Sequence, residues 1–235
     1  MIKFFRTIRK DLMEKNKTGK YFKYAIGEIV LVVIGILIAL SINNWNETRK
    51  EKVVIETIYE TIKNDLKNDI AEGKSILKKY APFELYFNKF LNGTFTEEDY
   101  DECKCDAIFI GFYDLYLNKR GFEMLKQTNN ELIIASDLPD NILNFYTEYF
   151  VNFELTEESL NEFLHEQIRK LSEYKWWSDY FSGIDETGFR DYLVNNKNAK
   201  NELVTFSVFL IQDYLPTIND FIIDAEALVT EIEQR

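Results

Sequence analysis

The chain has 235 residues, of which 46% are hydrophobic, 15% aromatic and 29% charged, and its formal net charge at pH 7 is −12. This apolar content excludes an intrinsically disordered chain, and the net negative charge excludes nucleic acid as a natural partner because binding phosphates requires a basic surface. With only 3 Pro and 9 Gly the chain has few helix breaks, so an all-α fold is expected.

Residues 1–24 form a basic segment that contains eight Lys and Arg side chains but only Asp11 and Glu14 as acids. Ile2, Phe5 and Ile8 recur at helical spacing between the basic residues. This pattern predicts a short amphipathic helix on the anionic inner surface of a membrane, so we interpret residues 1–24 as a cytoplasmic or interfacial segment.

Residues 25–45 read AIGEIVLVVIGILIALSINNW and contain Glu28 as their single charge. A bilayer core about 30 Å thick is crossed by roughly 20 helical residues, which matches this stretch. Aromatic residues suited to headgroup depth lie at both borders, Tyr24 at one and Trp45 at the other. A transmembrane helix is therefore expected over residues 25–45. The alternative is a cleaved signal peptide, because Ala39-Leu40-Ser41 resembles a small-x-small cleavage site.

The distribution of Lys and Arg predicts the orientation of this helix. Basic residues are dense before the span, whereas residues 47–235 hold the other 20 basic residues against 37 acids. Since cytoplasmic flanks are enriched in Lys and Arg, the N-terminus is expected in the cytoplasm and residues 46–235 outside.

Two features of the span extend beyond anchoring. Gly27, Gly35 and Ala39 lie at multiples of four residues, so they form a small-residue stripe where a second helix can approach closely. Glu28 lies beside this stripe, and an intramembrane carboxylate is a candidate ion or proton relay or interhelical hydrogen-bonding group. The simpler interpretation is that Glu28 reaches back to the interface near Lys23.

After the span, the apolar periodicity predicts an antiparallel bundle of helices in residues 46–235. Residues 47–80 form a stalk-like first helix, whose apolar stripe packs within the domain or pairs with a second subunit, and Pro82 ends it. Shorter helices are expected over residues 83–91, from residue 97, from residue 120 and over residues 189–194. Residues 140–153 form another helix, and a new one starts at Thr156 and runs to about residue 177. The last helix covers residues 202–232, with a kink or restart at Pro216.

The N-terminal part resembles a family of uncharacterised single-pass membrane proteins of Bacteroidota, a domain of unknown function. The resemblance rests on NKTGKYF at residues 16–22, YAIGEI at 24–29, VIGILIAL at 33–40 and INNWNE at 42–47, with weaker similarity over residues 121–149. It implies a protein of the bacterial envelope, anchored in the inner membrane with a helical periplasmic domain, and it implies no known activity.

The candidate chemistry is sparse. His165 is the single histidine, so neither a Glu-x-x-His carboxylate site nor a zinc helix can be completed, and no metal or cofactor is expected. Cys103 and Cys105 are a candidate redox pair, with separate thiols or an inert disulfide as the alternatives. No phosphate-binding loop or catalytic motif is present, so an enzyme is not expected.

Trp176 and Trp177 are candidates for contact with a partner, a glycan or a membrane surface, with packing under the following loop as the alternative. Together these patterns predict a membrane-anchored envelope scaffold or accessory subunit that acts by binding. Its expected partners are the lipid bilayer and either a second copy of the chain or another envelope protein. The alternative is a subunit of an ion-coupled or pore-forming assembly that uses Glu28.

Overall fold

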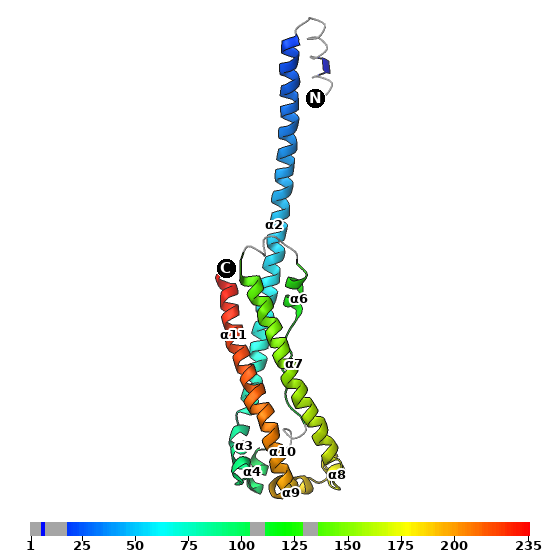
Figure 1. Cartoon of the computed structure of the whole chain (residues 1–235), viewed down its shortest axis with the longest axis vertical. Coiled ribbons are helices and arrows are strands. Elements are labelled where there is room, and N and C mark those ends of the chain that lie inside the picture. The colour runs from blue at the N-terminus through cyan, green and yellow to red at the C-terminus, as the bar shows by residue number, and fades with distance from the viewer. Residues whose placement is uncertain (1–5, 8–17, 104–110, 129–135) are drawn as a thin grey trace. The chain divides into compact units, whose positions relative to one another are not determined.

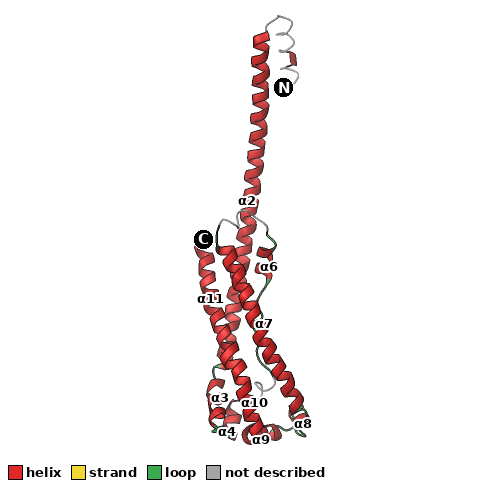
Figure 2. Cartoon of the chain, in the orientation of Figure 1, coloured by secondary structure: helices red, strands yellow, loops and turns green. Residues whose placement is uncertain are grey.

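The computed structural model describes residues 6–7, 18–103, 111–128 and 136–235, and these residues contain helices and loops but no strand (Figures 1 and 2). They form two compact units, Met1–Glu56 and Thr57–Arg235, and helix α2 (Thr18–Tyr80) contributes to both. The expected all-α class is confirmed. The predicted amphipathic helix of residues 1–15 lies almost entirely outside the described residues.

The first unit is dominated by the apolar half of α2. This helix is long and apolar enough to cross a membrane, and none of its most apolar window is buried. Every residue from Ile29 to Val54 is exposed. A contiguous exposed apolar surface of this kind is typical of a site of contact with a membrane or another protein.

Within the described part of the second unit, three long helical runs lie side by side (Figure 1). They are the end of α2, helix α7 (Leu138–Leu171), and a C-terminal run of α10 (Lys197–Ser207), the π-helical stretch η1 (Val208–Tyr214) and α11 (Leu215–Gln234).

Ion pairs and hydrogen bonds between the runs give their directions. Lys67 and Lys74 of α2 pair with Glu233 and Glu226, so α11 runs antiparallel to α2. Asn141 and Tyr149 of α7 bond to Glu231 and Asp224, so α11 is also antiparallel to α7. It follows that α2 and α7 run in the same direction. This parallel pair differs from the purely antiparallel bundle that the sequence predicted.

The core lies between these runs. The apolar stripe of α2 is covered within the chain, since Ile58, Ile62 and Leu66 are at most 1% exposed. Facing residues from the other runs are also fully enclosed, including Ile142 of α7 and Phe221 of α11. Each such side chain contributes about 1.5–3 kcal/mol by its burial. The stripe therefore packs within its own domain, which was the first of the two interpretations left open by the sequence.

Parallel neighbours cannot be joined by a short turn, so the chain must return along the bundle between α2 and α7. After α3 (Phe83–Asn92) and α4 (Glu97–Cys103), a non-helical segment at residues 111–119 leads to α6 (Arg120–Lys126) and then to α7. We call residues 111–119 the strap.

Contacts with α2 show that the strap is nearly extended. Tyr113 lies against Tyr80, and Asn118 lies against Asp69. The five-residue step from Tyr113 to Asn118 therefore runs alongside the eleven-residue step from Tyr80 to Asp69. At the extended rise per residue the first step is about 16 Å long, and at the helical rise the second step has the same length. The strap runs back along α2 as an extended chain.

Two boundaries differ from those predicted. Thr156 does not start a helix, because its hydroxyl donates to the Asn152 carbonyl at 2.9 Å inside the continuous 34-residue α7. Helix α7 then ends at Leu171, and the short α8 (Trp177–Phe181) and α9 (Thr187–Asn195) follow.

Pro216 marks a break in the C-terminal run, as predicted. It lies in the first turn of α11, directly after η1. Proline removes one backbone donor and crowds the preceding turn, and a π-helical stretch is one way for a helix to absorb this change.

Candidate functional site

The small residues of the span face open space in the first unit. A Cβ atom added at Gly27 or Gly35 would meet nothing within 4 Å, and Ala39 is exposed. Glu28 is half-buried. The stripe is thus free of packing constraints from its own chain, so a substitution there affects contacts with other molecules rather than the fold.

The candidate redox pair is only partly described. Cys103 closes α4, is 8% exposed and is disulfide-bonded. Cys105 lies outside the described residues.

Both candidate tryptophans are partly buried. The Trp176 ring lies 5.2 to 5.6 Å from the rings of Tyr174, Phe189 and Tyr192. A Cβ at residue 188 would lie 2.3 Å from Trp176 Cβ, so Gly188 makes room for this tryptophan. Trp176 therefore has a packing role.

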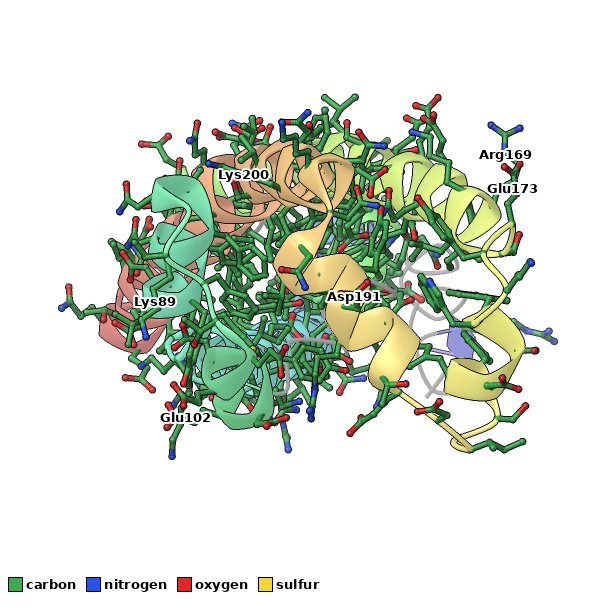
Figure 3. All side chains as sticks on the ribbon, turned by 90° about the horizontal axis from the view of Figure 1, so that it is seen from below. Lys89, Glu102, Arg169, Glu173, Asp191 and Lys200 are labelled. Atoms are coloured by element: carbon green, nitrogen blue, oxygen red, sulfur yellow. The ribbon has the colours of Figure 1, made fainter. Side chains whose placement is uncertain are left out.

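At the end of the bundle near α8, the most exposed apolar side chains are not the tryptophans but Phe181 and Ile184. Phe181, 5.0 Å from the Trp177 ring, is 62% exposed, and Ile184 is 76% exposed. Figure 3 looks onto this end, where Arg169 and Glu173 also point away from the helices. Sequence reasoning placed Phe181 near the candidate tryptophans but missed Ile184, although Gly183, with φ of 67°, marks the loop beside it. His165 is exposed too, and no metal-binding group is present among the described residues.

Tyrosines hold the first half of the strap. The Tyr80 hydroxyl accepts a hydrogen bond from the Tyr113 backbone N–H at 3.0 Å, and the Tyr214 hydroxyl accepts one from the Leu115 N–H at 2.8 Å. The Tyr214 oxygen also lies 3.3 Å from the Glu157 carboxylate. Buried side chains thus replace the backbone partners that an extended segment would find in a sheet.

Carboxylates of α2 hold the second half. Asp69 accepts hydrogen bonds from the backbone N–H of Asn118 at 3.0 Å and from its side-chain amide, while Asp65 accepts one from the Gly121 N–H at 2.8 Å. Asp69 is completely buried and Asp65 is 9% exposed. Four side chains from α2 and η1, namely Tyr80, Tyr214, Asp69 and Asp65, therefore fix the strap and the start of α6.

Burial makes the Asp69 carboxyl a weaker acid than an ordinary aspartate. Desolvation raises the pKa of Asp69 to about 6; the hydrogen bonds from Asn118 act against this, and the nearby Asp65 and Glu72 add to it. The Tyr146 hydroxyl of α7 lies in the field of both aspartates, and burial raises its pKa as well. Tyr146 is completely buried, and its hydroxyl has no hydrogen-bond partner among the described residues.

The two buried tyrosines provide a matched test of this assignment. Tyr214→Phe is expected to lower the free energy of unfolding by about 1–3 kcal/mol, because the Leu115 N–H loses its partner. Tyr146→Phe is expected to leave it unchanged or to raise it by up to about 1 kcal/mol, because an unpaired hydroxyl is removed. Urea unfolding of both variants checks the difference, and equal losses would contradict the assignment.

A groove lies where α2 ends. It has a volume of about 220 Å³ and is lined by apolar side chains of α2, α3 and the C-terminal run, together with Tyr80 and Glu84. Such a lining suits binding of apolar groups and supplies no nucleophile with an adjacent base.

Comparison with known proteins gives one match. A family model described as a family of unknown function (DUF6090) matches residues 28–104. The match covers the span from Glu28, the rest of α2, and α3 and α4, which is less than half of the chain. None of the curated proteins or solved structures compared with the chain matches it. The chain is therefore similar, over this N-terminal part, to an uncharacterised domain, as the sequence predicted.

Proposed function

We propose that this chain is a single-pass inner-membrane protein of the bacterial envelope whose exported helical domain acts by binding, as a scaffold or accessory subunit. One observation carries the proposal. The apolar surface from Ile29 to Ile42 is uncovered, whereas residues from Thr57 onward enclose their own core. A bilayer would cover the apolar surface of the first unit. The second unit needs no such cover, because it encloses a core of its own apolar side chains.

The proposed orientation rests on charge. The eight basic residues within the first 24 favour a cytoplasmic N-terminus and, with it, a periplasmic acidic domain. The non-catalytic part of the proposal rests on the sequence, with its single histidine and without a catalytic motif.

We further propose that the span associates with a second copy through Gly27, Gly35 and Ala39. Gly35→Ile is expected to weaken self-association about 5- to 30-fold, since close contact between membrane helices is worth roughly 1–2 kcal/mol. Open space around Gly35 within its own chain means that the substitution leaves the fold intact. Crosslinking in membranes, with molar mass measured in mild detergent, detects the change.

Val33→Leu is the matched control, because it adds bulk about 160° around the helix from Gly35. It is expected to leave association unchanged. A monomeric natural chain, or equal behaviour of the two variants, would rule out association through this stripe.

The alternative proposal is a subunit of an ion-coupled or pore-forming assembly that uses Glu28. The presence of a carboxylate within the apolar helix favours it, because buried charge is costly in a membrane. Glu28→Gln keeps the size of the side chain and removes its charge. It leaves a scaffold unaffected and abolishes ion coupling, so the same variant separates the two proposals.

A further inference from the structure

Carboxylates hold the strap at several points. Asp69 reaches it from α2, and Glu157 reaches it from α7 through the Tyr214 hydroxyl. Asp65 of α2 holds the Gly121 N–H at the start of α6, directly after the strap. The strap lacks helical or sheet hydrogen bonding of its own. How firmly it is held therefore depends on the state of these side chains.

The surroundings of Asp69 favour its neutral form. The charges that act on it are Asp65 and Glu72 of its own helix, both negative. The strap contributes the neutral amide of Asn118, and α7 contributes the neutral Tyr146 hydroxyl.

The neighbouring charges of other elements are engaged elsewhere. On the α11 side, Ile218 and Ile222 face α2 at Gly73, and Glu226 and Glu233 pair with lysines of α2. Lys119, at the end of the strap, lies 4.5 Å from the Phe150 ring centre. The described contacts thus give Asp69 two like charges and no opposite one.

We propose that the strap is a proton-operated latch, which is held more tightly on α2 when Asp69 binds a proton and is released more often when Asp69 is ionised. The Asn118 side chain serves both states. Its N–H donates to the ionised carboxylate, and after rotation of the amide its oxygen accepts the proton of the neutral acid.

The sign of the pH dependence follows from linkage. In the released state Asp69 is hydrated and returns to its ordinary pKa of 3.8, whereas in the held state its pKa is about 6. The held state therefore binds the proton more strongly, so the stabilisation is fully present below about pH 4 and is lost as the pH rises through about 6. A difference of about two pKa units changes the held-to-released ratio by up to about 100-fold. Burial and the nearby Asp114 also raise the pKa of Glu157, which acts in the same direction.

Hydrogen exchange of the full chain at pH 5 and pH 7.5, corrected for intrinsic exchange rates, tests the latch. Peptides that contain the Asn118 and Gly121 amides are expected to be about 10-fold more protected at pH 5, because pH 5 lies one unit below the held pKa of about 6. Asp69→Asn is expected to remove most of this pH dependence and to leave only the part that Glu157 contributes. Asp224→Asn, which alters a carboxylate bonded to Tyr149 of α7 outside the strap, is expected to keep it.

A strap equally protected at both pH values would overturn the proposal, as would a pH dependence that is undiminished in Asp69→Asn. If Asp69→Asn fails to fold, Asp65→Asn provides the second variant. Removing the negative neighbour lowers the pKa of Asp69, so the midpoint of the protection profile is expected to move to lower pH. An unchanged midpoint would also overturn the proposal.

Discussion

Replacement of Gly121 by alanine is expected to destabilise the second unit by about 3 kcal/mol, the upper end of the cost of overpacking. An added Cβ would lie 2.5 Å from Ile62 Cγ1 and 2.7 and 2.8 Å from the Ile62 backbone N and Cα. The backbone of α2 cannot yield as a flexible side chain can. The start of α6 must therefore move away from α2, which also weakens the hydrogen bond from the Gly121 N–H to Asp65.

Urea unfolding followed by circular dichroism measures this loss. Gly73→Ala is the matched control, because the atoms nearest to its added Cβ belong to the side chains of Ile222 and Ile218, at 3.2 to 3.3 Å. Alanine also favours a helix interior by about 0.5–1 kcal/mol, which offsets part of the crowding. A Gly121→Ala protein as stable as the natural chain would show that α6 does not pack on α2 in this way.

Two lysines in the centre of the span are expected to prevent membrane insertion. Each costs about 2.5–3.5 kcal/mol at the middle of a transmembrane helix, so Val33→Lys combined with Leu37→Lys costs roughly 5–7 kcal/mol. Both positions lie on the face opposite Gly35, which leaves the small-residue stripe unaltered. The doubly substituted chain is expected to leave the membrane fraction on alkaline extraction, whereas the natural chain stays in it.

Asn43→Lys combined with Asn44→Lys provides the control for added charge. These residues lie at the edge of the span, where lysine side chains reach the headgroups at low cost. The control is expected to remain in the membrane. If the double substitution at residues 33 and 37 also remained, the span would not be what retains the protein.

Local signals predicted much of the helix pattern. Helix α2 ends at Tyr80, just before Pro82. Helix α3 ends at Asn92, and the next residue, Gly93, has a φ of 69°, the left-handed conformation that glycine favours after a helix C-terminus. The apolar stripe of α2 could also be predicted from the sequence, because a helix that is buried on one face carries apolar residues every three or four positions. Such features depend on residues a few positions apart.

The strap could not be predicted from the same signals. Asp65 and Asp69 lie among other polar residues of α2, and nothing nearby in the chain indicates that they are buried. Their partners, Gly121 and Asn118, lie about 50 residues further on. The parallel course of α2 and α7, which makes the strap necessary, is also set by packing between distant segments.

Thr156 shows the opposite error. Threonine followed by acids is a frequent helix start, yet here the packing of α7 continues the helix through it and turns the hydroxyl back to the preceding turn. Tertiary packing outweighed a local preference of about 1 kcal/mol.

Protease treatment of bacterial spheroplasts that produce the full chain, tagged at both ends, tests the central claim most directly. The account predicts that the tag after Arg235 is removed from intact spheroplasts while the tag before Met1 survives until the membrane is lysed. Protection of the C-terminal tag until lysis, or recovery of the chain in the soluble fraction, would contradict a membrane-anchored protein with an exported domain.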